Sequence, residues 1–262
     1  MIRVGIGGWT FEPWRGTFFP KGLPAARELE YASERLTAIE INGTYYRTQT
    51  PDTFKKWAKA TPENFMFSVK ASRFSTNRKD LATAGESIAF FLNSGVLELG
   101  DKLGPILWQF APTKKFTETE IGGFLDLLPE KHKGHALRHV IEAKHPSFES
   151  ADFIALARKH KVGIVQVEDE DHMPVADLTA GFVYARLQNT QEEIETGYPL
   201  PALKQWAKRA QAWEKGEAPK DLKLIAPAEK TKSTRDVFLY FISGAKVRAP
   251  AAAMAMIEQL KK

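Results

Sequence analysis

Short apolar runs rich in β-branched and aromatic residues recur along the whole chain, and amphipathic stretches of helical periodicity separate most of them. The runs predict strands, and the stretches between them predict helices. The predicted strands lie at residues 2–8, 38–42, 65–70, 106–110, 138–143, 162–167, 182–187 and 237–241. Only residues 173–180 separate the acidic run after the sixth strand from the seventh strand, so we expect the sixth helix to be missing or reduced to a turn.

Alternation of this kind predicts parallel strands that are joined by helical crossovers. Eight such units in 262 residues favour closure into a barrel, and an open doubly wound sheet is the lesser alternative. No Ser/Gly-rich linker divides the chain. We therefore predict an α/β fold in which residues 1–262 form one domain, a single eight-stranded parallel β/α barrel of the TIM type.

The composition excludes several classes of protein. Because the chain has no cysteine, it cannot use a disulfide framework, a thiolate metal site or a cysteine nucleophile. Met1 leads directly into the first strand without a basic and then apolar leader, and no apolar run approaches the length of a membrane span, so we expect a cytoplasmic protein with no membrane contact. The net charge of +5 permits a phosphate-bearing partner without requiring one. Nothing in the sequence indicates the oligomeric state.

The strand at residues 38–42 gives the strongest indication of a site. Ile39 and Ile41 alternate there with Glu40 and Asn42. A central parallel strand is covered on both faces, so Glu40 and Asn42 would point into the interior. A buried carboxylate must find partners, because burying it unpaired is costly.

Further polar residues fall at the carboxyl ends of the predicted strands, where the loops of a β/α barrel gather functional groups. We predict that Glu40 and Glu142 are catalytic acid/base groups. The predicted ligand-binding residues are Trp9, Asn42, Tyr45, Lys70, Gln109, Lys144, His145 and Arg186. Lys144 and Arg186 would hold an anion, while Trp9, Trp108 and Tyr45 would form apolar walls. The expected ligand is a small anion that is phosphorylated, sugar-like or a nucleotide.

The interior charges have two interpretations. They could neutralise one another in a closed network of salt bridges, or they could line an open, wet mouth. Period two places Glu142 with Lys144, and Tyr184 with Arg186, on the same side of their strands. We expect the open mouth, because the charges gather at one end among aromatic residues.

A metal site is a weaker interpretation of the same end of the barrel. Ligand types suited to a divalent ion are present in Glu142, His145, Glu168, Asp169 and His172. Their spacing matches no specific metal motif. We therefore predict no metal and no other cofactor.

Two other function classes remain open. A nucleic-acid-binding protein, with or without phosphodiester cleavage, would stack bases on the aromatic loop at residues 9–19. Its phosphate contacts would be Arg73, Arg78, Lys79, Lys144 and Lys246. A scaffold without a ligand would instead have a mouth plugged by side chains. If the protein is an enzyme, only fold analogy indicates a hydrolase, lyase or isomerase.

Several motifs follow one another in a distinctive order. They are Gly5–Thr10 with Trp14–Gly16, Glu40–Arg47, Phe65–Lys70, Lys102–Gln109, Tyr184–Leu187 and Val237–Phe241. In this order they resemble the YecE-like family, which is the domain of unknown function number seventy-two. The resemblance covers nearly the whole chain and implies an eight-stranded barrel without a settled activity. The chain departs from the family pattern at Lys144, where the family usually has arginine, and at Ser243–Gly244, where it has a polar Asn-Asn/Asp pair.

Overall fold

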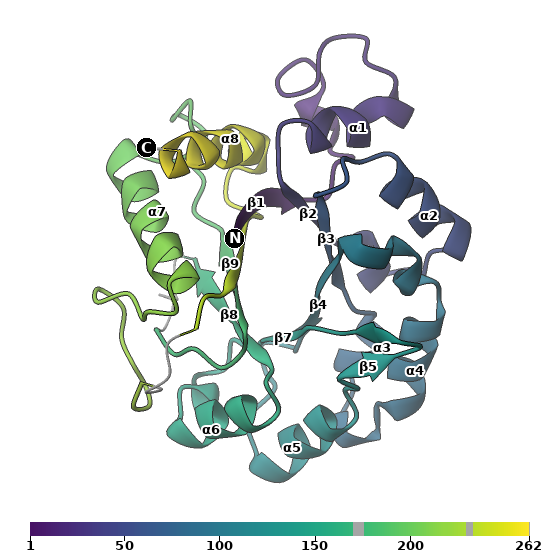
Figure 1. Cartoon of the computed structure of the whole chain (residues 1–262), viewed down its shortest axis with the longest axis vertical. Coiled ribbons are helices and arrows are strands. Elements are labelled where there is room, and N and C mark those ends of the chain that lie inside the picture. The colour runs from purple at the N-terminus through teal and green to yellow at the C-terminus, as the bar shows by residue number, and fades with distance from the viewer. Residues whose placement is uncertain (170–175, 229–232, 262) are drawn as a thin grey trace.

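A closed barrel of parallel strands forms the centre of the molecule (Figure 1), in a computed structural model that describes residues 1–169, 176–228 and 233–261. Its strands are β1 Ile2–Gly7, β2 Ala38–Ile41, β3 Met66–Lys70, β4 Leu103–Gln109, β7 His139–Glu142, β8 Gly163–Glu168, β9 Phe182–Leu187 and β10 Asp236–Phe241. Around the barrel the order is β1, β10, β9, β8, β7, β4, β3 and β2, and every neighbouring pair is parallel. The predicted eight-stranded parallel barrel is therefore confirmed.

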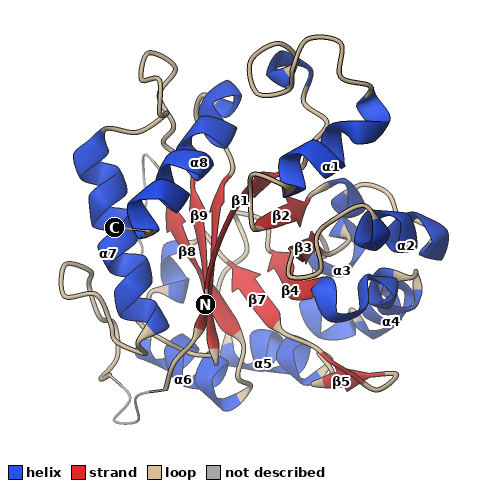
Figure 2. Cartoon of the chain, turned by 45° about the horizontal axis from the view of Figure 1, so that its top comes forward, coloured by secondary structure: helices blue, strands red, loops and turns tan. Residues whose placement is uncertain are grey.

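The helices surround this barrel (Figure 2). They are α1 Glu28–Ser33, α2 Pro51–Lys59, α3 Arg73–Thr76, α4 Gly85–Asn93, α5 Glu118–Asp126, α6 Ala151–Lys159, α7 Leu200–Glu214 and α8 Ala249–Leu260. Between β8 and β9, the described residues 176–181 contain no helix, while residues 170–175 lie outside the described part of the chain. Among the helices that are described, none combines the length and the apolar character needed to cross a membrane.

Each barrel strand turns one set of side chains outward to the helices and the other set inward. On β2, Ile39 and Ile41 join the outer core beneath the helices, whereas Ala38 belongs to the inner cluster. Glu40 alternates with the two isoleucines and is fully buried. The inner cluster includes Met66, Leu107, Val140, Val165, Tyr184, Phe238 and Tyr240. The middle of the barrel is thus packed mainly by apolar and aromatic side chains.

The structure differs from the predicted pattern in three local features. The apolar stretch from residue 88 to residue 99 does not form one helix, because Gly95 takes a φ of 112° and a short 3-10 helix, Val96–Lys102, follows it. The fourth strand begins at Leu103 and not at residue 106, so Gly104 and Pro105 lie within β4, where the register against β3 shifts. A short antiparallel hairpin, β5 Lys131–His132 with β6 His135–Ala136, was not predicted, and it stands away from the barrel (Figure 2).

His139 on β7 is a buried histidine outside the mouth of the barrel. The indole Nε1 of Trp108 donates to His139 Nδ1 at 3.1 Å. The neutral ring therefore carries its proton on Nε2, which donates to the carbonyl of Pro129 at 2.9 Å. Burial lowers the pKa of His139 to about 4, and protonation of Nδ1 would set two donors against each other.

We expect this histidine to make the protein less stable in mild acid. In the unfolded chain, His139 takes up a proton near its ordinary pKa of about 6.5, whereas in the folded chain it does so only near pH 4. Between these two pH values the unfolded state binds more protons, so the free energy of unfolding decreases as the pH falls from about 6.5 to about 4. The free energy of unfolding should drop by about 2 kcal/mol more between pH 7 and pH 5 in the wild type than in His139→Gln. Denaturant titrations at the two pH values measure this difference, and parallel pH profiles of the two proteins would contradict it.

Candidate functional site

Three charged side chains from three strands meet at the carboxyl ends of the barrel strands, a region called here the barrel mouth. Arg186 of β9 donates from Nη2 to Oε1 of Glu40 at 3.0 Å and from Nη1 to Oε2 of Glu142. All three residues are buried, with Arg186 only 4% exposed. One guanidinium group therefore bridges two carboxylates that lie on separate strands, β2 and β7.

The other carboxylate hydrogen bonds come from neighbouring polar side chains. Asn42 Nδ2 donates to Glu40 Oε1 at 2.9 Å, and Gln109 Nε2 donates to Glu142 Oε1 at the same distance. The hydroxyl of Tyr184 donates to Glu40 Oε2 at 2.6 Å. Tyr184 was not among the predicted ligand-binding residues, although its shared face with Arg186 was the signal that could have identified it.

Mutual pairing stabilises the charged form of the guanidinium group. Burial alone would favour neutral arginine, but the carboxylates of Glu142 and Glu40 outweigh it and raise the pKa of Arg186. Burial and the nearby Glu40 carboxylate both raise the pKa of Tyr184 well above its ordinary value, so this phenol stays protonated. Arg186 Nε is buried and has no hydrogen-bond partner among the described residues.

Lys70 ends β3 at the same mouth. It is buried, and its Nζ lies 4.3 Å from the centroid of the Tyr45 ring. Burial and the positive charge of Arg186 lower the pKa of Lys70, and Glu40 and Glu142 offset part of that effect. Lys70 forms no ion pair within the described residues, because the carboxylates of Glu40 and Glu142 are both paired to Arg186.

Lys246 approaches from the segment that follows β10. Its Nζ lies 4.8 Å from the centroid of the Phe11 ring and 5.6 Å from that of Trp14. Partial burial lowers the pKa of Lys246, and the charge of Glu40 works against this. Like Lys70, it makes a cation–π contact in place of an ion pair in the part of the chain that the structure describes.

Three predicted ligand-binding residues contact other parts of the chain. Lys144 Nζ pairs with Asp169 at 2.7 Å. His145 Nδ1 accepts from the backbone N–H of Ser147 at 3.1 Å and so caps a 3-10 turn. Trp9 packs edge-on against Trp57, with ring centroids 5.0 Å apart. They lie outside the network of hydrogen bonds around Arg186.

The closed network replaces the open mouth that we expected for the central charges. Glu40, Glu142 and Arg186 are buried and satisfy one another directly. The alternation of side chains along the strands correctly placed these three residues in the interior. The nearby aromatic residues, however, do not keep the three charged groups apart from one another. Above this floor, Asn42, Tyr45, Gln109 and Lys144 are half-buried, so the exposed part of the mouth begins with these residues.

The aromatic loop at residues 9–19 is also different from the stacking surface of the nucleic-acid hypothesis. Trp14, Phe18 and Phe19 are buried in the outer core. Trp14 Nε1 donates to the carbonyl of Lys246 at 3.0 Å, which ties the loop to the segment after β10. The loop therefore covers one end of the core, and its buried rings cannot stack on bases.

The three carboxylates of the metal interpretation each have a different partner. Glu142 pairs with Arg186, Asp169 with Lys144, and Glu168 Oε2 accepts from the hydroxyl of Tyr198 at 2.8 Å. His172 lies outside the described residues. Within residues 1–169, 176–228 and 233–261, no three histidine, aspartate or glutamate side chains converge as metal ligands.

The departure from the family pattern at Ser243 and Gly244 has a local structural role. Ser243 Oγ donates to Gln188 Oε1 at 3.0 Å, and the hydroxyl of Thr190 donates to the Ser243 carbonyl at 2.7 Å. Gly244 has a φ of 81°, and a Cβ there would lie 2.6 Å from backbone atoms of Thr190. This pair joins the loops after β9 and β10.

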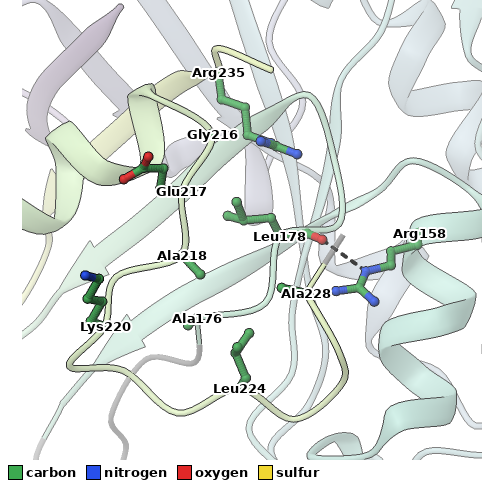
Figure 3. A pocket seen from close by; sticks show the side chains of 10 residues that line it. All are labelled: Arg158, Ala176, Leu178, Gly216, Glu217, Ala218, Lys220, Leu224, Ala228 and Arg235. Atoms are coloured by element: carbon green, nitrogen blue, oxygen red, sulfur yellow. Dashed lines mark hydrogen bonds between the residues drawn. The ribbon is translucent and has the colours of Figure 1, made fainter. Parts of the chain in front are cut away.

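A separate cavity of about 330 Å³ is lined in part by the segments that lead into β9 and β10 (Figure 3). Its lining includes Arg158 and Arg235, which the sequence did not indicate as site residues. Arg158 Nε donates to the Leu178 carbonyl at 3.2 Å, and Arg235 Nε donates to the Ala180 carbonyl at 2.9 Å. These guanidinium groups brace the chain that enters β9.

Comparisons with known proteins give one family. A family model described as "Protein of unknown function DUF72" matches residues 3–262. The UPF0759 protein YunF of Bacillus subtilis is 26% identical over 117 residues, which are 43% of this chain and 40% of that protein. The match thus spans about two fifths of the length of that curated relative.

Two solved structures share the fold. A DUF72 family protein from Thermotoga maritima superposes with a TM-score of 0.76 at 21% identity, over 100% of each chain. A DUF72 family protein from Enterococcus faecalis has a TM-score of 0.73 at 18% identity, over 100% of this chain and 96% of the other. At these identities the likeness shows the fold alone.

Proposed function

The chain belongs to the DUF72 family of proteins of unknown function, as its motifs predicted, and from the charges of the barrel mouth we propose that it binds and processes a small anionic ligand there. The observation that carries the proposal is the pair Lys70 and Lys246. Both ammonium groups are at least partly buried, lie over aromatic rings and form no ion pair within the described residues. A cation that is withdrawn from water without a counter-ion favours an anion as its partner.

The balance of charges at the mouth supports the same class of ligand. The three cations Arg186, Lys70 and Lys246 outnumber the two carboxylates of Glu40 and Glu142, so these groups together carry one excess positive charge. Both carboxylates are ion-paired to the guanidinium group, and neither lysine has an ion pair within the described residues. The Nε of Arg186, which has no hydrogen-bond partner among the described residues, adds a further buried donor. A phosphorylated, sugar-like or nucleotide ligand would supply the acceptor oxygens that these donors lack.

Acid/base chemistry in this proposal belongs to Glu40 and Glu142. The half-buried amides of Asn42 and Gln109 each donate to one of these carboxylates and so fix its orientation. Arg186 holds both groups in place, which is the preorganisation that proton transfer to or from a bound ligand requires. The cytoplasm, where phosphorylated metabolites are made, is the compartment of this proposal.

Loss of either unpaired lysine should weaken anion binding. We expect Lys70→Met and Lys246→Met each to raise the Kd for inorganic phosphate about tenfold, because a charge-assisted hydrogen bond contributes about 1.5–3 kcal/mol. Methionine keeps an unbranched apolar stem against the rings. Isothermal titration calorimetry at low salt measures the change, and Lys59→Met, an exposed lysine at the end of α2, is the matched control.

The proposal would be contradicted if phosphate bound equally well to the wild type and to all three variants. It would also be contradicted if phosphate bound to none of the four proteins, and that result would favour the scaffold interpretation of the barrel. A thermal melt of each variant confirms that any loss of binding occurs in a folded protein.

A further inference from the structure

The exposed aromatic side chains of this protein gather in one place. In the described part of the chain, the tyrosine, phenylalanine and tryptophan side chains that count as exposed are Tyr46, Phe74 and Phe90, at 68%, 64% and 67%. All three line the same groove of about 210 Å³. They come from three segments that are distant in sequence, namely the loop after β2, the short helix α3, and α4. Single exposed apolar residues need no explanation, but a cluster of them marks a binding surface.

The groove has a polar rim without negative charge. Its other lining residues are Arg47, Thr48, Ser72 and Ser87. Arg73 adds a second exposed cation, with its Cζ 5.5 Å from the centroid of the Phe74 ring. Aromatic faces beside arginines, with hydroxyl groups and no carboxylate, suit a ligand that has a planar ring and a negative charge.

Tyr45 connects the groove to the barrel mouth through direct side-chain contacts. The ring of Tyr46 packs edge-on against that of Tyr45, with centroids 5.0 Å apart. Tyr45 also contacts Lys70, whose Nζ is 4.3 Å from the centroid of that ring. Ser72, which lines the groove, follows Lys70 by two positions. A ligand whose anionic group lies at Lys70 can therefore extend past Tyr45 into the groove.

We infer that the ligand of the mouth is a nucleotide, whose phosphate binds at Lys70 and whose base stacks in the groove of Tyr46, Phe74 and Phe90. This inference rests on the proposed function, and it adds the chemical class of the ligand. The groove of about 210 Å³ is smaller than the roughly 300–1,000 Å³ of pockets that enclose a whole drug-sized molecule. It can therefore hold one ring system but not an entire nucleotide. Every nucleobase has a π face, so the groove selects for a base without selecting which base.

The experiment compares four probes: adenosine 5′-monophosphate, ribose 5-phosphate, adenosine and inorganic phosphate. In the wild type, we expect the Kd of adenosine 5′-monophosphate to be at least about tenfold lower than that of ribose 5-phosphate, because only the nucleotide has a base to stack. Phe74→Ala and Phe90→Ala should remove this advantage and leave the affinity for ribose 5-phosphate unchanged. Lys70→Met should weaken both phosphorylated probes. Leu200→Ala, at a 50% exposed apolar residue of α7, is the control.

The outcomes separate the inference from the proposed function. Equal affinities for the monophosphate and ribose 5-phosphate would overturn the inference and leave the anion site intact. A third outcome is that the wild type binds adenosine, loses this binding in Phe90→Ala, and binds none of the three phosphate-containing probes. That result would support the base groove and contradict the proposed anion site. A wild-type dimer in sedimentation that becomes monomeric in Phe74→Ala would assign the groove to a second copy and overturn the inference.

Discussion

Replacement of Arg186 by methionine is expected to lower the free energy of unfolding by about 3–5 kcal/mol, because it leaves two buried carboxylates without their cation. Glu40 and Glu142 are both buried and both depend on this guanidinium group. Methionine fills much of the same volume, so the effect isolates the lost charge from a lost contact. Equilibrium denaturation at pH 7 measures it.

The control for Arg186→Met is an ion pair on the surface. Lys161 and Glu130 lie 3.2 Å apart with side chains 72% and 74% exposed. Lys161→Met should change stability by less than about 0.5 kcal/mol, since exposed pairs contribute little. If Arg186→Met were equally mild, the buried network would be a minor contributor, and water would have to reach the carboxylates in the folded protein.

Replacement of Gly5 by alanine is expected to destabilise the protein by about 3 kcal/mol, at the upper end of the range for overpacking. Gly5 faces Ala38 across the β1–β2 pair. A Cβ at this position would lie 1.9 Å from the Ala38 carbonyl oxygen and 3.2 Å from the Tyr240 ring. Because the nearest obstacle is backbone, it can move only if two strands of the barrel separate.

Gly43→Ala is the matched control for that substitution. A Cβ at Gly43 meets nothing within 4 Å, and its φ is not in the left-handed region. The free energies of unfolding of the two variants, measured by denaturation, should therefore differ by most of the loss expected for Gly5→Ala. Wild-type stability in Gly5→Ala would mean that the barrel is looser between β1 and β2 than the register indicates.

The barrel could be predicted from the sequence because its signals are local. Each strand is a short apolar run, and each helix has its own stripe, so the alternation alone predicts parallel closure. Period two then placed Glu40, Glu142 and Arg186 on inward faces before any contact was known. The part of the site that strand periodicity controls was thus accessible.

What the sequence could not predict depends on distances between segments. The pattern left a closed network and an open mouth as alternatives, and it could not show that Arg186 reaches both carboxylates. Strand periodicity grouped Lys144 with Glu142, but β7 ends at Glu142, and Lys144 pairs with Asp169 from the loop that follows. The shared groove of Tyr46, Phe74 and Phe90 has no linear motif, because tertiary packing alone brings the three segments together.

The pairing of β1 with β10 has a consequence for synthesis of the chain. Residues 2–6 acquire one of their two neighbours only from residues 237–241, so a nascent chain carries an unpaired strand edge until nearly all of it has left the ribosome. Open edges of this kind recruit other strands and promote aggregation. At roughly 5–20 residues per second, translation leaves that edge exposed for some ten seconds or more. The earliest strand is therefore the segment for which we expect a chaperone to have the longest access.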